Sequence, residues 1–484
     1  MNVEPPNILI FMVDHGQSDV FRSDHPAITP NVERLAAEGV DFTEAYCPAA
    51  HCCPSRASFM TGLMPSQHGV FNNVSNSSAI HRGLAPGVTT FAEALADVGY
   101  QLTYCGKWHV SDETGPGDHG WRERNVTANC GSSESRRHDP WWKGSSSEIT
   151  EERGRPWGEL VTPGWGDYRL FERLPDDTAP ADEIVVTAGL DALEEYSKQS
   201  DRPWCLFVGP IGPHDPYRVP GPFLDLYEPD TIPLPDSYRD RLHDKPNVYR
   251  RMREQLWDQL TEAEVRDAIR HYWAYCSYED ELFGQLLDVL DRTDSARNTL
   301  VLFTSDHGDY VGAHGLFLKG IPAFREAYNV PAIVRWPERV TAPGRRISAL
   351  VSLADFAPTF LDIADARGEA PMTGRTLAPF FADDTPRAWR TALATEMNGV
   401  ELYYSQRALI TARWKFVYNG FDFDELYDRA TDPHELRNLA VEREFASVVE
   451  QLTSQMWRVA EDGGDWMLGN HYATVRLAAR GPMR

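Results

Sequence analysis

The sequence predicts an α/β protein with a large mixed, mostly parallel sheet sandwiched by helices, followed by a smaller C-terminal α+β subdomain that carries an antiparallel sheet. Continuous apolar runs at residues 7–13, 203–209 and 298–304 are typical of strands buried on both faces. Segments with helical spacing separate these runs, as expected of parallel strands joined by crossover helices. Alternating apolar segments between residues 393 and 418 indicate the small antiparallel sheet.

The composition limits the class of protein. A chain of 484 residues is long enough for one large domain with a smaller one. Asp and Glu number 72 and Lys and Arg number 47, so the formal net charge is −25. This acidity argues against nucleic acid and anionic membranes as partners. Basic residues in a site for an anion would have to act against the overall field.

The cysteines and the N-terminal segment indicate the compartment. Seven cysteines are irregularly spaced, and no paired Cys-x-x-Cys pattern of a zinc site is present. A reducing compartment is the simpler interpretation. The first residues enter a strand at once and contain neither a basic segment nor a long apolar run, so we expect no signal peptide and no transmembrane helix. The sequence therefore predicts a cytoplasmic protein.

Several elements can be placed in order along the chain. Pro30 suits the first position of a helix that Gly39 ends. Further helices are expected at residues 89–98, 181–198 and 261–292, and further strands at residues 101–105, 330–336 and 349–353. We place the domain boundary after residues 374–377, which gives a catalytic domain over residues 1–378 and a C-terminal subdomain over residues 379–484, closed by a helix at 441–462.

The segment His-Cys-Cys-Pro-Ser-Arg-Ala-Ser-Phe-Met-Thr-Gly at residues 51–62 organises the rest of the chain. Pro54 has a preset φ and needs no N–H donor, which predicts a helix that begins near Cys52. The positive end of that helix and the permanent cation of Arg56 favour an anionic group there. A buried free cysteine would also account for the segment, and from these residues alone the two interpretations weigh about equally.

Polar side chains directly follow the buried strands. Asp14 comes after the first strand, and Asp306 and His307 come after the strand at residues 298–304. An aspartate with a histidine at a strand end is typical of a divalent metal site, although Asp14 could instead cap a turn. Lys107 and His109 follow another strand and point the same way. A lysine there can neutralise an anion, and a histidine can transfer protons.

Two regions lack clear periodicity. Residues 111–178 are polar and rich in Gly, Ser, Arg and Trp, so we expect an insertion that covers the site and determines substrate specificity. Its tryptophans could stack on a sugar or an aromatic group, or anchor the insertion to the body of the protein. They are Trp141, Trp142, Trp157 and Trp165. Residues 217–253 are expected to form another loop at the rim of the site.

Most of the chain resembles one known family. The motif Cys-x-Pro-Ser-Arg at residues 52–56, with Thr-Gly at 61–62, resembles the signature of the type I sulfatases of the alkaline-phosphatase-like superfamily. Further matching elements are Gly-Lys-Trp-His at 106–109, Pro-His-Asp-Pro at 213–216, Ser-Asp-His-Gly at 305–308 and the segment at 312–319. The resemblance extends from Asp14 to Leu439, and it implies the alkaline-phosphatase-like fold and hydrolysis of sulfate esters.

The resemblance also implies two cofactors. In the family the first cysteine of the motif is oxidised to formylglycine, so Cys52 would be converted by a formylglycine-generating maturation enzyme. One divalent metal ion is implied, with Ca²⁺ as the family's common choice and Mn²⁺ or Mg²⁺ as alternatives. Its ligands would be Asp14, Asp306, His307 and the formylglycine from Cys52. Many sulfatases have a second aspartate where this chain has His15, so His15 could be a ligand, a substrate contact or a donor that orients a ligand.

The family's mechanism can be carried onto individual residues by the same resemblance. One oxygen of the hydrated aldehyde attacks sulfur and releases the alcohol, and the other oxygen later expels sulfate. His109 is implied as the base near the hydrate, which Arg56 orients. Lys107 and Lys319 would balance the charge of the sulfate, and His214, together with Lys319, would protonate the leaving oxygen.

Three hypotheses follow. The first is a sulfuric-ester hydrolase that acts on a sulfated sugar or another small sulfate ester. The second is a phosphonate monoester or phosphodiester hydrolase, because the Asp-His pair at residues 306–307 also resembles members with that activity. The third is a non-catalytic binding protein in which Cys52 is unmodified. The sequence leaves open the alcohol half of the substrate, the metal and the oligomeric state.

Overall fold

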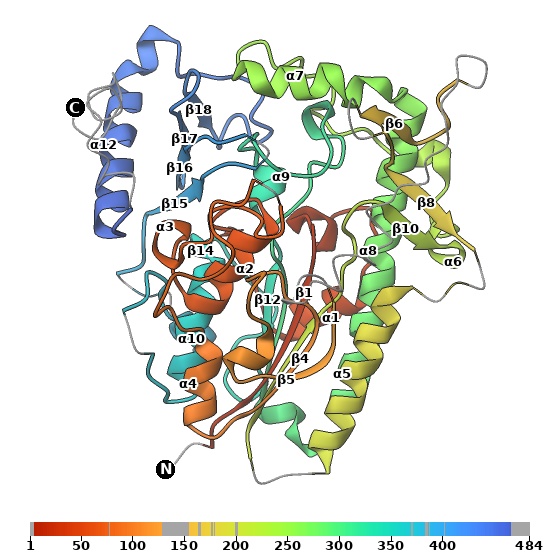
Figure 1. Cartoon of the computed structure of the whole chain (residues 1–484), viewed down its shortest axis with the longest axis vertical. Helices are drawn as coiled ribbons and strands as arrows, with labels where there is room; N and C mark the ends of the chain where they lie inside the picture. Colours follow the sequence, from red (N-terminus) through yellow and green to blue (C-terminus); the bar gives the residue numbers. More distant parts are fainter. Residues whose placement is uncertain are drawn as a thin grey trace.

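An eight-stranded mixed sheet runs through the middle of the molecule (Figure 1). The computed structural model describes residues 4–465 apart from 77, 128–153, 163–165, 176–177, 179, 199–201, 369–370, 383–385, 387 and 401. The strands of this sheet are β1 (Asn7–Val13), β2 (Val40–Phe42), β4 (Gln101–Lys107), β5 (Arg122–Thr127), β9 (Trp204–Gly209), β11 (Thr299–Ser305), β12 (Ala332–Arg335) and β13 (Arg345–Ile347). Their order is β13-β2-β12-β11-β1-β9-β4-β5, and only β12 runs antiparallel to its neighbours. The predicted mixed, mostly parallel sheet is confirmed.

The register of the central strands determines which residues meet beyond the sheet. β1 pairs in parallel with β11 over its whole length, from Asn7 opposite Thr299 to Val13 opposite Ser305. Both strands are apolar and almost completely buried, as expected of central strands with helices on both faces. Because the two strands end side by side, Asp14 and Asp306 leave the sheet next to each other.

Helices cover both faces of the sheet (Figure 1). On one side α1 (Pro30–Glu38) and α5 (Ala181–Ser197) pack against the long α8 (Glu262–Leu290). On the other side α2 (Cys52–Thr61), α4 (Phe91–Asp97) and α10 (Phe356–Ile363) contact one another. The helices predicted from Pro30, near Cys52 and at residues 89–98, 181–198 and 261–292 are confirmed. α4 and α8 both begin with a capping box, in which a threonine and a glutamate satisfy each other's backbone N–H groups.

The predicted insertion at residues 111–178 is wrong at its start. β5, which lies within that range, pairs in parallel with β4 and forms the edge of the main sheet. Its sequence, Arg-Glu-Arg-Asn-Val-Thr, lacks the apolar pattern from which the other strands were predicted. Strands at the edge of a sheet often carry charged residues, which prevent aggregation through the open edge. The segment that follows the sheet contains only short strands. They are β6 (Glu159–Thr162), β7 (Gly166–Arg169) and β8 (Phe171–Leu174).

One of the four tryptophans in this segment has a defined role. The indole N–H of Trp157 donates to the Asp267 carboxylate on α8 at 2.8 Å, although 56% of the residue is exposed. This contact anchors the segment to the body of the protein. Trp141, Trp142 and Trp165 lie outside the described residues.

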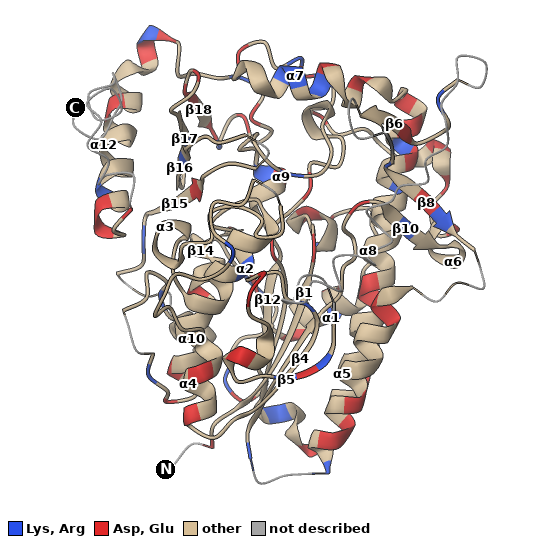
Figure 2. Ribbon diagram, in the orientation of Figure 1, with Lys and Arg blue, Asp and Glu red and all other residues tan. Residues whose placement is uncertain are grey.

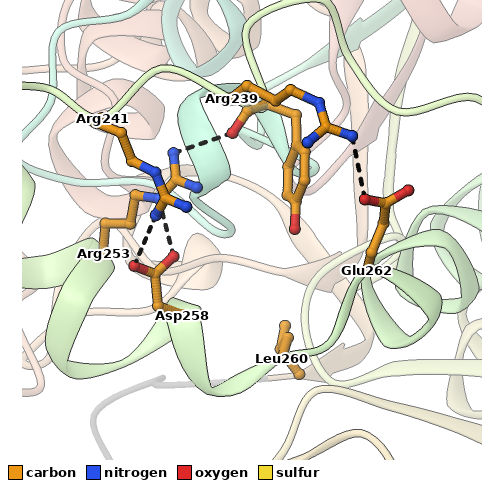
Figure 3. A pocket seen from close by; sticks show the side chains of 7 residues that line it. Arg239, Arg241, Arg253, Asp258, Leu260 and Glu262 are labelled. Carbon is orange, nitrogen blue, oxygen red and sulfur yellow. Dashed lines mark hydrogen bonds and ion pairs between the residues drawn. The ribbon is translucent and has the colours of Figure 1, made fainter.

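The predicted rim loop at residues 217–253 is also partly wrong. β10 (Tyr217–Pro220) pairs in parallel with β8, and α6 (Gly221–Leu224) and α7 (Asn247–Gln255) follow. Arg253 near the end of α7 is buried, and its guanidinium donates to the carbonyl oxygen of Tyr238 at 3.0 Å (Figure 3) and to that of His314 at 3.0 Å. α7 also packs Val248, Tyr249 and Met252 against the main core, and arginines between these residues interrupt the apolar pattern in the sequence.

The C-terminal sheet is antiparallel, as predicted. Its strands are β15 (Ala392–Met397), β16 (Gln406–Thr411), β17 (Trp414–Asn419) and β18 (Glu425–Asp428). Alternate residues face opposite ways: Ala408 and Ile410 join the main core, whereas Leu409 and Phe416 pack with Trp457 of α12 (Ala446–Asp462). Since the main core continues into this sheet, the division of the chain at residue 378 stays a prediction.

The remaining elements are short. They are β3 (Ala45–Tyr46), β14 (Val351–Ser352), α3 (Pro65–His68), α9 (Arg325–Tyr328) and α11 (Ala378–Phe381). Figure 2 shows acidic residues, in red, along α4, α5 and α12, in keeping with the net charge. Among the described residues, no helix is both long and apolar enough to span a membrane.

A close backbone approach beside the sheet gives a testable prediction. Gly106 has φ +91°, and a Cβ there would overlap the carbonyl oxygen of Gly209 on β9. Gly106→Ala is expected to lower the free energy of unfolding by about 2–4 kcal/mol, through backbone strain and overpacking. The control is Gly87→Ala, where φ is +81° but a Cβ meets no atom within 4 Å, so about 1 kcal/mol of strain is expected. Denaturant unfolding measures both, and equal losses would contradict the overlap.

Candidate active site

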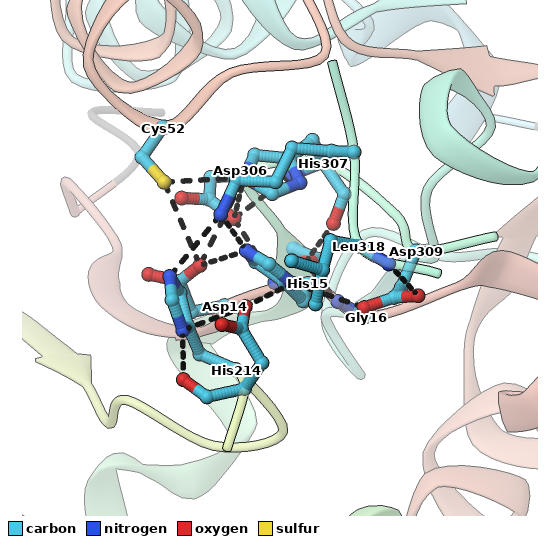
Figure 4. A network of polar contacts seen from close by, with 12 residues as sticks. Asp14, His15, Gly16, Cys52, His214, Asp306, His307, Asp309 and Leu318 are labelled. Atoms are coloured by element: carbon cyan, nitrogen blue, oxygen red, sulfur yellow. Dashed lines mark hydrogen bonds and ion pairs between the residues drawn. The ribbon is translucent and has the colours of Figure 1, made fainter. Parts of the chain in front are cut away.

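Four strand ends and one helix N-terminus meet at a single buried site (Figure 4). Asp14 follows β1, Lys107 ends β4, His214 follows β9, and Asp306 and His307 follow β11. Except for His214, which is 8% exposed, these side chains are no more than 1% exposed. The carboxyl ends of parallel strands lie at one edge of the sheet, which is where ligands of α/β proteins bind.

Cys52 reaches the same site from the first position of α2. His51 before it is extended, with φ −154° and ψ 138°, and Gly62 ends the helix with φ 70°. Pro54 lies in the first turn, as predicted. The hydroxyl of Ser55 donates to the carbonyl oxygen of Asp306 at 2.5 Å and joins the helix to the end of β11.

The thiol of Cys52 lies among potential metal ligands. Its Sγ is 3.2 Å from Nε2 of His307 and 3.9 Å from Oδ1 of Asp14. Burial opposes the thiolate, but the cations of Lys107 and Lys319 lower the pKa of this thiol well below its ordinary value. The other described cysteines all have raised pKa values, because burial opposes their thiolates more strongly than any nearby cation favours them, and none forms a disulfide.

Two carboxylates and two cations lie beneath Cys52. The guanidinium of Arg56 donates to Asp306 at 2.8 Å and to Asp14 at 3.3 Å, and also to the carbonyl oxygen of Lys107 at 2.9 Å. The ammonium of Lys107 pairs with Asp14. Burial would raise the pKa of Asp14, but these cations lower it to about 2. The carboxylate of Asp14 is therefore ionised although it is buried.

His15 lies in this group as well. The donor atoms of Asp14, His15, Cys52 and His307 all lie within 4.8 Å of one another. Nδ1 of His15 contacts the Asp309 carboxylate at 3.1 Å, and Nδ1 of His307 contacts the carbonyl oxygen of Gly308 at 2.8 Å. Such contacts hold the proton on Nδ1 and leave Nε2 as an acceptor, which is how metal-binding histidines are usually oriented. This donor set fits a divalent cation.

Asp306, the fourth predicted ligand, lies beside this group of four residues and is not one of its members. Its Oδ1 lies 3.9 Å from Nε2 of His307 and accepts hydrogen bonds from the backbone N–H of His15 at 3.3 Å and of His307 at 2.9 Å. Its Oδ2 accepts from Arg56. The structure thus brings the four predicted ligands to one site and adds His15 to them.

The predicted acid–base residues surround the group. His214 contacts the carbonyl oxygen of Asp215 through Nδ1 at 2.6 Å and Nζ of Lys319 through Nε2 at 3.2 Å. Lys319 also contacts His15. His109 has φ 54°, its pKa is lowered by burial and then by Lys107, and neither of its ring nitrogens meets a hydrogen-bond partner of good geometry among the described residues.

The sequence analysis missed several polar side chains of the site. Asp309 accepts from the Tyr217 hydroxyl at 2.9 Å, and burial, with Asp215 nearby, raises the pKa of Asp309 to about 7. The hydroxyl of Tyr168 donates to Asp215 from the segment between β5 and α5. Asp309 could have been found, because it follows His307 by two residues at the same strand end. Tyr168 gave no sequence signal.

Family comparisons agree with this arrangement. A family model described as Sulfatase matches residues 6–366, which is most of the chain. The chain belongs to the sulfatase family. A second model, described as N-sulphoglucosamine sulphohydrolase, C-terminal, matches residues 312–462. The fold and the enzyme class predicted from the sequence are therefore confirmed.

Individual sulfatases and related hydrolases cover most of the chain. Choline-sulfatase of Rhizobium meliloti is 33% identical over an alignment of 469 positions, and the match covers 91% of this chain and 83% of that protein. N-acetylglucosamine-6-O-sulfatase of Bacteroides thetaiotaomicron is 26% identical over an alignment of 518 positions, and the match covers 92% of this chain and 85% of that protein. The phosphonate monoester hydrolase of Agrobacterium radiobacter has a similar fold, with a TM-score of 0.76 and 22% identity over 98% of this chain and 99% of that one.

The electrostatics of this sulfatase site can be tested on protein that still carries the thiol. Lys107→Met removes the cation that contributes most to lowering the pKa of Cys52, so the thiolate is expected to form at a higher pH. Thiolate absorbance of metal-free protein measures the change. Lys198→Met, at the end of α5 and outside the site, is the control and leaves the titration unchanged. An unaltered titration in Lys107→Met would contradict the electrostatic assignment.

Proposed function

We propose that this sulfatase hydrolyses a sulfate monoester of a sulfated sugar or another small alcohol, with Cys52 matured to formylglycine and one divalent metal ion bound beside it. The observation that carries the proposal is the convergence of Cys52, the carboxylate of Asp14 and the imidazole of His307 with several cations. A tetrahedral anion needs positive charge around its oxygens, and a poor leaving group needs an acid.

The donor set supports the metal. Asp14, Asp306, His307 and the matured Cys52 would hold the ion, and His15 lies close enough to take part. Ca²⁺ is the family's common choice, and Mn²⁺ or Mg²⁺ is the alternative, since all three ions bind carboxylate oxygens. When bound, the ion would supply positive charge for the sulfate, and formylglycine would supply the nucleophilic oxygen.

The chain's own cations hold and orient the reacting groups. Arg56 fixes the carboxylates of Asp14 and Asp306 below Cys52, so it keeps the nucleophile's surroundings in place. The charges of Lys107 and Lys319 both act on Cys52, which supports their proposed role of neutralising sulfate oxygens.

Two histidines would move protons. His109 is neutral at neutral pH and has ring nitrogens free of good hydrogen bonds among the described residues, so it can accept a proton near Cys52. Nδ1 of His214 is committed to the carbonyl oxygen of Asp215, and its Nε2 accepts from Lys319. The pair of Lys319 and His214 therefore carries the proton that the leaving oxygen requires.

The alcohol half of the substrate is proposed from the relatives. One relative is named for choline sulfate and another for a 6-O-sulfated N-acetylglucosamine. Both are small alcohols, and the acidic surface of this chain offers no attraction to a polyanion. The phosphonate monoester hydrolase of similar fold keeps phosphonate monoester or phosphodiester hydrolysis as the alternative.

The nucleophile can be tested directly. Cys52→Ala is expected to lower kcat/KM for p-nitrophenyl sulfate by about 10⁴-fold or more, as loss of a covalent nucleophile does in other hydrolases. Cys53→Ala is the matched control, because its thiol points away and accepts from the backbone N–H of Val74 at 3.4 Å. Mass analysis of the peptide that contains Cys52 should find one sulfur and two hydrogens replaced by one oxygen, which is the change from the thiol to the aldehyde. Full turnover by Cys52→Ala would exclude the mechanism.

The substrate class can be tested with matched esters. A sulfate monoester presents three non-bridging oxygens to the cations, whereas a phosphonate monoester replaces one of them with carbon. We therefore expect kcat/KM of the matured enzyme to be at least about tenfold higher for p-nitrophenyl sulfate than for p-nitrophenyl phenylphosphonate, since an unpaired polar site costs about 1.4 kcal/mol or more. The reverse order would favour the alternative.

A further inference from the structure

A buried pair of carboxyl groups lies behind the site and takes no part in the proposed chemistry. Asp182 is in the first turn of α5 and Glu279 is in the middle of α8, and they are 2% and 0% exposed. None of the ion pairs among the described residues involves either group. Burying two acids together without a cation is costly, so another set of groups must stabilise them.

Three donors converge on the carboxyl group of Asp182. The backbone N–H groups of Ile211 and Gly212 donate to it at 2.6 and 3.3 Å, and the Tyr275 hydroxyl donates at 2.9 Å. Oδ1 accepts from Ile211, and Oδ2 accepts from Gly212 and Tyr275, so both oxygens act as acceptors. Burial raises the pKa of Asp182, and burial together with the charge of Asp182 raises the pKa of Glu279 well above its ordinary value.

The two backbone donors belong to the turn that follows β9. The carbonyl oxygen of Gly212 accepts from the backbone N–H of Asp14 at 3.0 Å. The backbone N–H of His214 donates to the carbonyl oxygen of Ile211 at 3.1 Å and closes the turn. One short segment therefore joins the carboxylate of Asp182 to both a proposed metal ligand and a proposed acid.

The turn also packs tightly on α8. A Cβ at Gly212 would overlap Glu279 and the ring of Tyr275, so only glycine allows the backbone to approach this closely. The turn is thus held by hydrogen bonds from one helix and by contact with another.

We infer that Asp182 is a positioning residue: its buried carboxylate holds the turn at residues 211–214 and thereby sets the places of His214 and Asp14. This inference rests on the proposed function, because the role of His214 as part of the acid belongs to it. Asp182 touches neither the substrate nor the metal site, and it acts through the two backbone N–H groups.

The inference explains why a carboxylate is needed here. In Asp182→Asn one oxygen becomes an amide nitrogen, which donates and cannot accept. At least one of the backbone N–H groups would then face another donor and lose its hydrogen bond in a buried place. Glu279→Gln, by contrast, keeps the size of the side chain and leaves both backbone hydrogen bonds to Asp182 intact, so the turn should be kept.

The test compares these variants on aryl sulfates whose leaving groups range from good to poor. A misplaced acid matters most when the leaving oxygen is basic. In Asp182→Asn we expect kcat/KM to fall about tenfold for p-nitrophenyl sulfate and about 100-fold or more for the poorest leaving group, so that the dependence on leaving-group pKa becomes steeper. Glu279→Gln and Asp191→Asn, an exposed position on the same helix, should keep both the rate and the dependence of the wild type.

Each outcome decides the inference. A wild-type dependence in Asp182→Asn, or an equal loss on every ester, would overturn it, because His214 would then be unaffected. Should Asp182→Asn fail to fold, Tyr275→Phe removes one of the three donors, and a smaller steepening supports the inference whereas an unchanged dependence overturns it. If the wild type hydrolyses no sulfate ester, the proposed function fails. Amide hydrogen exchange at Ile211 and Gly212 then decides. Faster exchange in Asp182→Asn supports the inference that Asp182 holds the turn, and equal protection overturns it.

Discussion

The site depends on charges that compensate one another inside the protein. Asp14 and Asp306 are completely buried, and Arg56 and Lys107 are buried against them. Lys107 and Arg56 help lower the pKa of Asp14 to about 2, so this carboxylate stays ionised. Removing any one partner would leave an uncompensated charge in a medium of low dielectric, which is among the most costly changes a fold can undergo. Lys107 also helps lower the pKa of Cys52, so one arrangement of charges stabilises the fold and acts on the thiol.

The parallel pairing of β1 with β11 brings these charges together. The two strands are paired over their whole length and end at the same level, so that the residues following them occupy one place. β4 and β9 are paired in parallel in the same sheet and deliver Lys107 and the turn before His214 to the same edge. A sheet with another strand order would leave the same motifs far apart, although every motif would still be intact.

The cations of the site, Arg56, Lys107 and Lys319, explain how a protein with a large negative net charge can bind an anionic substrate. The net charge is −25, but much of the acidity lies on helices that surround the site, and Arg56 and Lys107 at its centre are buried. Buried charges are screened less than exposed ones, so the field near Cys52 is set by its neighbours rather than by the distant surface. An overall negative charge therefore does not prevent the binding of sulfate.

The sequence by itself determined the strands, the helices of the main domain and most of the polar residues of the site. Apolar runs followed at once by Asp14, Lys107 or Asp306 carry this information locally, because burial selects apolar residues up to the point where a strand ends. It did not reveal β5, whose edge position permits a charged sequence, nor α7, in which arginines interrupt the apolar residues that face the core. Only the tertiary structure decided that His15 joins the candidate ligands, that Tyr168 reaches Asp215, and that Asp182 supports the turn before His214. These contacts join residues far apart in the chain, and a hydrogen bond across that separation leaves no periodic trace in the sequence.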